Sequence, residues 1–181
     1  MITGPSGVGK GTLIRLLRDQ IPELELSVSA TTRAPRAGET DGVDYHFLSD
    51  EEFARRVEHG DFVEWARYSG RSYGTLRSDL QRRTSAGHPV VLEIEVQGAR
   101  QVRDTLPEAL QIFIRPPSDQ ALRDRLVGRG TDGGEEVERR LQVAEQELAA
   151  ADEFPHQVVN DRLEDAVAEL VAIVRASLAE D

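Results

Sequence analysis

A glycine-rich loop near the N-terminus has the residue types and the spacing of a phosphate-binding site. It consists of Gly4, Pro5, Ser6, Gly7, Val8, Gly9, Lys10, Gly11 and Thr12. Glycines let the backbone curl so that successive N–H groups point at one anion, and the helix expected after the loop directs its positive end to the same place. The loop therefore predicts a nucleotide-binding site, in which Lys10 reaches the outer phosphates as a catalytic cation.

Lys10 is the only lysine among the 22 basic residues of the chain. Lysine ends in a compact ammonium group and arginine in a wide, planar fork, so a loop that encloses phosphates has room for the first and not the second. The alternative is a lysine retained by chance, and the spaced glycines beside it argue against this. The next position, where a Ser or Thr hydroxyl commonly binds Mg²⁺, is Gly11, so the protein ligand of the metal stays open.

Two arginines, Arg33 and Arg36, flank a proline in a turn-rich segment that also contains Tyr45. Proline stiffens a loop, and two fixed guanidinium groups suit the dianion of a phosphate monoester. The segment therefore predicts a second phosphate site, to which the Tyr45 hydroxyl can donate. The alternative is an ordinary solvated loop.

A carboxylate suited to a base with two neighbouring N–H groups follows in the next predicted strand, residues 61–66. Glu64 lies between Val63 and Trp65 in an alternating pattern and points to the opposite side from both. It is either a ligand for a donor pair, such as N1–H and N–H₂ of guanine, or an exposed strand carboxylate. The polar segment 68–75, which we interpret as turn-rich, offers Tyr73 and Thr75 as further partners.

Two further carboxylates, Glu93 and Glu95, share one face of an apolar segment, residues 90–98, which we interpret as a buried parallel strand. Ligands of open α/β sheets bind beyond the carboxyl ends of the strands. The two side chains are therefore candidates for contacts to Mg²⁺ through water or to a substrate. The alternative is a pair of edge carboxylates, although burial without partners would cost free energy.

A hairpin of two helices, residues 118–126 and 135–151, is predicted around a glycine-rich bend. Its basic residues include Arg125, Arg129 and Arg140. Glycines provide mobility and arginines provide charge, which a lid over phosphates requires. The alternative is a charged hairpin exposed to solvent.

Composition narrows the function classes further. The 181 residues suit a single domain, and the net charge of −11 argues against a general nucleic-acid-binding face. The sequence has no cysteine, no apolar run long enough for a membrane span and no visible signal peptide, which favours the cytoplasm and no membrane partner. Only three residues precede the loop, so we expect the natural chain to start upstream. Nothing in the sequence indicates a protein partner.

The most specific motif lies in the segment around the two arginines. It comprises Thr31, Thr32, Arg33, Arg36, Glu39, Gly42, Tyr45, Phe47 and Leu48. Together with the glycine-rich loop and the later pairs Tyr73-Gly74, Gln97-Gly98, Arg140-Leu141 and Asn160-Asp161, this motif resembles guanylate kinase over essentially the whole chain. Guanylate kinases are P-loop kinases of nucleoside monophosphates.

The resemblance implies an α/β fold, with a P-loop NTPase-type parallel sheet flanked by helices. It implies a core at residues 1–29, 88–117 and 147–181, a β-rich GMP-binding part at 30–87 and a helical lid at 118–146. The implied reaction transfers the γ-phosphoryl group of ATP to GMP with Mg²⁺, giving ADP and GDP.

The resemblance also assigns roles to the matching positions. The GMP phosphate is expected to contact Arg33, Arg36, Tyr45 and Tyr73. Guanine is expected to contact Ser29, Glu64 and Thr75, with Glu95, where the family usually has aspartate, on the guanine or on the metal shell. The transferred phosphoryl group and ATP are expected to contact Arg125, Arg129 and Arg140, and adenine to lie near Asn160.

Two other functions stay open at this point. A guanylate-kinase-like module can bind phosphopeptides without catalysis, but such modules typically lack a working phosphate loop. A related kinase can act on another phosphorylated small molecule, such as a ribose bisphosphate; Glu64 and the complete motif argue against that activity.

Overall fold

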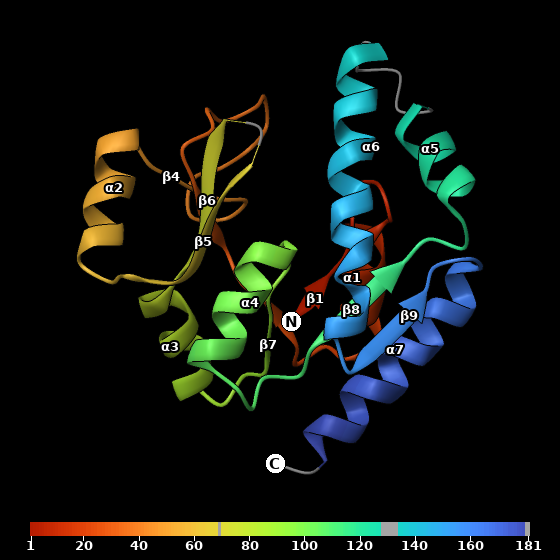
Figure 1. The fold of residues 1–181 in the computed structure, drawn as a ribbon. Helices are drawn as coiled ribbons and strands as arrows, with labels where there is room; N and C mark the ends of the chain where they lie inside the picture. The colour runs from red at the N-terminus through yellow and green to blue at the C-terminus, as the bar shows by residue number, and fades with distance from the viewer. Residues whose placement is uncertain (69, 128–133, 180–181) are drawn as a thin grey trace. The chain divides into compact units, whose positions relative to one another are not determined.

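The computed structural model describes residues 1–68, 70–127 and 134–179, and its chain divides into two compact units (Figure 1). The first unit comprises Met1–Pro22, Glu93–Val96 and Leu110–Asp181. The second comprises Glu23–Leu92 and Gln97–Ala109. The chain therefore passes between the two units several times, and each unit has a sheet of its own.

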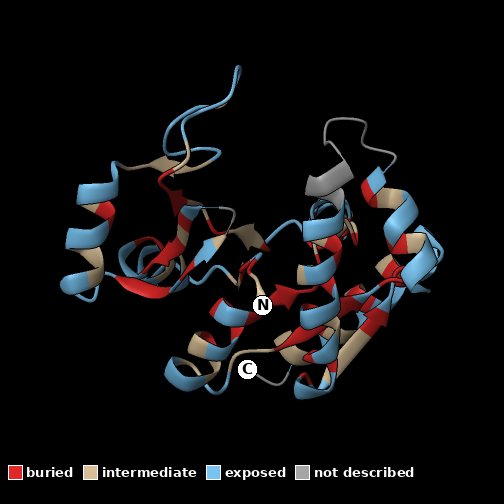
Figure 2. Ribbon diagram, turned by 45° about the horizontal axis from the view of Figure 1, so that its top comes forward, coloured by how far each residue is buried: buried red, intermediate tan, exposed pale blue. Residues whose placement is uncertain are grey.

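A parallel sheet in the order β1-β8-β9 forms the centre of the first unit. Its strands are β1 (Ile2–Thr3), β8 (Ile112–Arg115) and β9 (His156–Val159). Helices α1 (Lys10–Gln20) and α7 (Leu163–Leu178) pack together beside it. The apolar residues of β8 are fully buried, as Figure 2 shows in red, which explains why this segment reads as an unbroken apolar run.

The hairpin predicted as a lid consists of α5 (Asp119–Val127) and α6 (Gly134–Ala149), followed by the short helix η1 (Ala151–Glu153). The two long helices lie side by side (Figure 1) and bury Leu122 and Leu126 against Leu141 and Ala144. Apolar residues at helical spacing on both helices therefore hold the hairpin together.

The second unit is built on a mixed sheet in the order β4-β3-β6-β5. Its strands are β3 (Ser29–Thr31), β4 (His46–Phe47), β5 (Phe62–Tyr68) and β6 (Arg71–Leu76). Helix α2 (Asp50–Glu58) covers it, and the rings of Phe53 and Phe62 stack at 4.5 Å between centroids. A parallel pair, β2 (Glu25–Leu26) and β7 (Val90–Val91), completes the strands, together with helices α3 (Arg77–Ser85) and α4 (Val96–Thr105).

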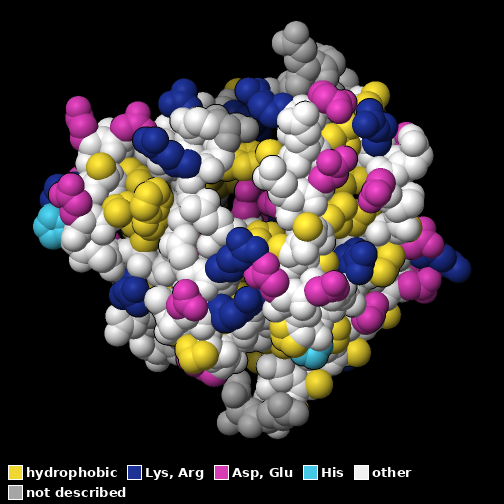
Figure 3. All heavy atoms as spheres, viewed as in Figure 1, with side chains coloured by type: hydrophobic (Ala, Val, Ile, Leu, Met, Phe, Trp, Pro, Cys, Tyr) yellow, Lys and Arg dark blue, Asp and Glu magenta, His cyan; other side chains and the backbone are white. Residues whose placement is uncertain are grey.

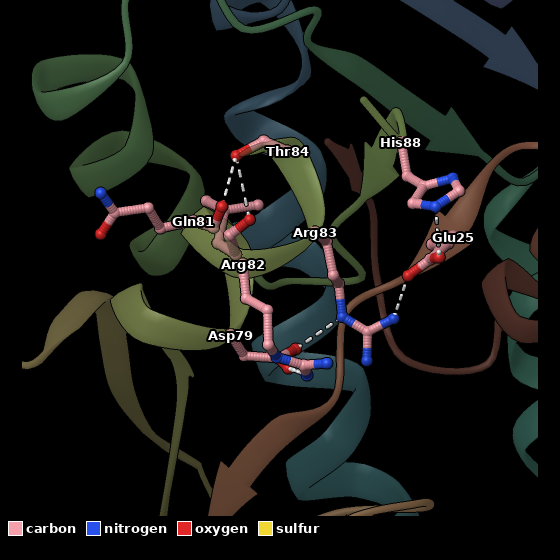
Figure 4. A network of polar contacts seen from close by, with 8 residues as sticks. Glu25, Asp79, Gln81, Arg82, Arg83, Thr84 and His88 are labelled. Carbon is pink, nitrogen blue, oxygen red and sulfur yellow. Dashed lines mark hydrogen bonds and ion pairs between the residues drawn. The ribbon is translucent and has the colours of Figure 1, made fainter. Parts of the chain in front are cut away.

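A buried carboxylate ties α3 to β2 in this unit (Figure 4). Asp79 accepts hydrogen bonds from Arg82 and from Nε of Arg83, the latter at 2.8 Å, and Arg83 also donates to Glu25. Burial alone would raise the pKa of Asp79, but the two arginines outweigh it and hold the pKa below its usual value. The ion-pair network therefore fixes α3 by charged hydrogen bonds, since that helix has few apolar residues.

Two segments differ from the structure that we predicted for them. The polar segment 68–75, interpreted as turn-rich, contains β6, which pairs with both β3 and β5. The strand predicted over 90–98 is only two residues long, because α4 already begins at Val96.

Candidate active site

The glycine-rich loop connects β1 to α1 in the first unit, and three of its glycines have positive φ angles. A Cβ at Gly4 would lie 2.5 Å from the carbonyl oxygen of Ile114, and one at Gly7 would lie 2.7 Å from Cδ2 of Leu126. A Cβ at Gly9 would lie 2.7 Å from Nδ2 of Asn160. Both the backbone conformation and the space therefore require glycine at these positions.

Lys10 lies at the start of α1, and its ammonium group points back into the loop. Nζ donates to the carbonyl oxygens of Gly4 at 2.5 Å and Pro5 at 3.3 Å. The first turn of α1, which includes Gly11 and Thr12, has no acidic residue. The N–H groups at the start of a helix have no partner within the helix, so this turn offers donors and a positive dipole to an anion.

Two of the predicted arginines and Asn160 lie against the same loop. Arg140 on α6 donates to Oγ of Ser6 at 2.8 Å. Arg125 on α5 donates to the carbonyl oxygens of Val8 at 3.2 Å and Asn160 at 2.9 Å. The buried amide of Asn160 donates to the carbonyl oxygen of Val8 at 2.8 Å. Arg129, the third predicted arginine, lies outside the described residues.

Glu93 and Glu95 follow β7 and belong to the first unit. Partial loss of hydration raises the pKa of both carboxyls, and the positive charge of Lys10 opposes this shift. A Cβ at Gly11 would lie 3.9 Å from Oε2 of Glu93. The Glu93 carboxylate therefore lies next to the place where other P-loops carry a hydroxyl.

A third carboxyl near Lys10, Glu147 on α6, was not predicted from the sequence. It is 7% exposed, it accepts the backbone N–H of Ser6, and its Oε2 has no hydrogen-bond partner among the described residues. Burial raises the pKa of Glu147 to about 7, the negative charge of Glu95 adds to this shift, and Lys10 opposes it. The folded protein therefore retains a proton on Glu147 in a pH range where the unfolded chain has lost it.

Replacing Glu147 with glutamine is expected to stabilise the protein more at pH 8 than at pH 5. Because the folded-state pKa is raised, the stability associated with this proton is complete below pH 4.5 and is lost as the pH rises through about 7. We therefore compare the free energy of unfolding of Glu147→Gln with that of the wild type at each pH. The variant's value relative to the wild type should be higher at pH 8 than at pH 5 by roughly 3 kcal/mol.

Urea unfolding at both pH values measures this shift. The matched control is Glu145→Gln, an exposed carboxylate on the same helix, for which the difference from wild type should be equal at the two pH values. A pH-independent difference for Glu147→Gln would contradict a raised pKa.

In the second unit, the predicted phosphate-binding residues gather around Arg33. Its guanidinium lies 5.1 Å from the ring centre of Tyr45, and the rings of Tyr45 and Tyr73 meet edge to face at 6.3 Å. Glu39 accepts two hydrogen bonds from Arg33, at 2.8 and 2.9 Å, and one from the backbone N–H of Arg36 at 2.7 Å. The Arg36 side chain is exposed, and its positive charge helps to lower the pKa of Glu39.

Glu39 is a second site residue to which the sequence analysis assigns no role. Hydrogen bonds from Arg33 and from the backbone of Arg36 lower the pKa of its carboxyl. The only local sign of this role in the sequence is the spacing: Glu39 follows Arg33 by six residues and Arg36 by three, so its carboxylate can orient both.

The three predicted guanine-binding residues lie in one row across the sheet. Ser29 on β3 is paired with Thr75 on β6, which is paired with Glu64 on β5, and residues directly opposite in a sheet share a face. Oγ1 of Thr75 donates to Oε1 of Glu64 at 2.7 Å, and these two residues are 1% and 5% exposed. Glu64 is therefore not an exposed strand carboxylate.

A family model and several known proteins match nearly the whole chain. The family model described as guanylate kinase matches residues 1–177. A guanylate kinase from Synechococcus sp. (strain CC9311) is 55% identical over 94% of this chain and 90% of its own length. The protein of that name from Frankia casuarinae is 52% identical over 98% of this chain and 96% of its own.

A solved structure has a similar fold. The match to the crystal structure of guanylate kinase from Anaplasma phagocytophilum covers 97% of this chain and 84% of the chain in that structure. The TM-score is 0.77, and the two sequences are 32% identical. Matches of this extent cover both the phosphate loop of the first unit and the arginine cluster of the second. The chain belongs to the guanylate kinase family.

Proposed function

We propose that the described residues of this chain carry out the family's reaction, the transfer of the γ-phosphoryl group of ATP to GMP, by binding the phosphates, the guanine base and Mg²⁺. As a member of the family, the protein is a nucleotide-binding kinase that uses ATP and phosphorylates GMP. The observation that supports the roles is that each unit has a separate set of residues suited to phosphate, the glycine-rich loop with Lys10 in the first and the cluster around Arg33 in the second. A nucleoside monophosphate kinase must bind two phosphorylated molecules.

The ATP phosphates are assigned to the loop of the first unit. The N–H groups of the loop and of the first turn of α1 surround the phosphates, and Lys10 exchanges its contacts with Gly4 and Pro5 for contacts with phosphate oxygens. Arg140 and Arg125 lie against this loop and neutralise charge on the transferred group, as Arg129 is also proposed to do. The contact of Asn160 with adenine stays a prediction.

Mg²⁺ fits the carboxylates beside the loop. Hard oxygen ligands that retain water suit this ion, and Glu93 lies next to the open position at Gly11. We propose that Glu93 and Glu95 would hold Mg²⁺ through water beside the nucleotide phosphates. When bound, the ion neutralises phosphate charge.

The GMP phosphate is assigned to Arg33, Tyr45 and Tyr73, with Arg36 available from solvent. Glu39 holds the guanidinium of Arg33 by two hydrogen bonds, so the cation is oriented before the substrate arrives. Guanine is assigned to the row of Ser29, Thr75 and Glu64. The Glu64 carboxylate accepts the two N–H groups that guanine presents and adenine does not.

The chemistry requires positioning and charge neutralisation more than a strong base. The acceptor is a phosphate oxygen of GMP, which is already anionic near neutral pH, so no side chain must remove a proton before attack. Water must be excluded, or ATP is hydrolysed instead. We therefore retain the prediction that the GMP-binding part (30–87) and the lid (118–146) close on the core before transfer.

Other partners receive no support from the described residues. Acidic and basic side chains are interspersed on the face in Figure 3. No helix in the described ranges is both long and apolar enough to cross a bilayer. Residence in the cytoplasm stays a prediction.

A coupled assay of ADP formation tests the proposal with GMP, AMP, dTMP and a ribose bisphosphate as acceptors. We expect kcat/KM for GMP to exceed that for each other acceptor by at least about 100-fold. EDTA should abolish turnover and excess Mg²⁺ should restore it. Absence of turnover with GMP, or better turnover with another acceptor, would refute the assignment.

A further inference from the structure

Gly98, in the first turns of α4, is a buried glycine whose missing side chain matters for one neighbour. A Cβ at this position would overlap Oε2 of Glu64 and would lie 3.1 Å from its Cδ. The φ angle of Gly98 is not positive, so the helix backbone here accepts any residue. The glycine is therefore required for space and not for backbone conformation.

Glu64 is held on two sides, and both lie in the second unit. Thr75 donates to Oε1 from the neighbouring strand, and the backbone of α4 lies against Oε2. The start of a helix favours a negative charge, so this approach also suits an ionised carboxylate. The position of Glu64 thus depends on the surface of α4 as much as on its own strand.

Gln101 holds helix α4 close to strand β5. Its Oε1 accepts the backbone N–H of Trp65 at 3.1 Å, and its Nε2 donates to the carbonyl oxygen of the same residue at 2.7 Å. Gln101 lies three residues after Gly98, so both are on the same side of α4. The helix therefore binds the backbone next to Glu64 and leaves β5 little freedom to retreat.

We propose that Gly98 is a specificity-determining position, because only a residue without a Cβ lets the Glu64 carboxylate stay in the orientation that accepts guanine. Gln101 is the positioning residue that keeps β5 and α4 together. This inference rests on the proposed role of Glu64 as the residue that reads guanine.

Alanine at position 98 separates this role from a purely structural one. Alanine favours helices over glycine, and the atom it would meet is the end of a flexible side chain, so folding should not suffer. To make room, the Glu64 carboxylate must rotate and give up its hydrogen bond to Thr75. Stability and guanine recognition should therefore respond in opposite directions.

The experiment measures Gly98→Ala in steady-state kinetics with full-length protein and in thermal unfolding. We expect kcat/KM for GMP to fall 10- to 100-fold, mainly through KM, with KM for ATP and Tm no worse than in the wild type. Gln101→Ala should show a smaller loss of the same kind, and Gln81→Ala, an exposed glutamine on α3, should show none. Unchanged KM for GMP, or a lowered Tm, in Gly98→Ala would overturn the inference.

A double-mutant cycle with Glu64→Ala tests whether the effect passes through the carboxylate. In that background Gly98→Ala should cost nothing further, and an equal cost in both backgrounds would overturn the inference. A different result would refute the proposed role of Glu64 in guanine recognition. If Glu64→Ala alone leaves kcat/KM for GMP unchanged, guanine is read elsewhere and the role of Glu64 is wrong.

Discussion

Replacing Lys10 with arginine is expected to reduce kcat/KM by at least about 10³-fold, or about 4 kcal/mol of transition-state stabilisation, although the charge is retained. The ammonium group lies within the loop, at hydrogen-bond distance from the carbonyl oxygens of Gly4 and Pro5. A guanidinium group is wider and planar, and the close contacts of the neighbouring glycines leave the loop no room to expand. The cation would therefore be displaced from the transferred phosphoryl group.

The measurement is kcat and KM for both nucleotides, with a melting curve to confirm folding. Arg15→Lys is the matched control, since it makes the reverse exchange on an exposed surface of α1, where Arg15 pairs with the exposed Asp19. It should behave as the wild type. More than a tenth of wild-type activity in Lys10→Arg would show that charge alone suffices.

The phosphate loop could be predicted because its determinants are local. Positive φ angles require glycine wherever the loop occurs, and the lysine follows at a fixed distance along the chain.

Strand β6 was missed because two of its buried residues, Ser72 and Thr75, are polar and a third, Gly74, has no side chain. Ser72 and Thr75 are 7% and 1% exposed; the backbone N–H of Ser72 donates to Oγ1 of Thr32, and the hydroxyl of Thr75 donates to the Glu64 carboxylate. The alternation of apolar and polar residues that identifies most strands is absent here. A strand that lines a site for a polar base carries hydroxyl groups where other strands carry apolar side chains.

The roles of Glu39 and Glu147 depend on contacts that spacing does not encode. Glu147 has the sequence context of a surface acid on a charged helix, and only the packing of α6 against the loop buries it beside Ser6. Glu39 lies in a turn-rich loop, and its pairing with Arg33 depends on how that loop folds back. Tertiary packing, which local patterns do not specify, therefore accounts for the site residues that were missed.

Replacing Glu64 with glutamine is expected to reduce kcat/KM for GMP by about 10²- to 10³-fold, with little change in KM for ATP. Glutamine has almost the same shape, so the sheet should fold normally and the Thr75 hydroxyl can still donate to the amide oxygen. The amide nitrogen, however, presents donors to a base edge that consists of donors. Guanine would meet an N–H group in place of an acceptor, and Glu64 itself is only 5% exposed, so little water is available there as a substitute.

The assay compares GMP with AMP, because the two bases differ at the edge that Glu64 is proposed to read. Activity with AMP should not fall by the same factor, so the ratio of kcat/KM for GMP to that for AMP should drop. Glu51→Gln, an exposed carboxylate on α2, is the matched control and should leave the ratio unchanged. If Glu64→Gln lowered the apparent affinities for GMP and ATP equally, the carboxylate would be supporting the fold of the enzyme and not selecting the base.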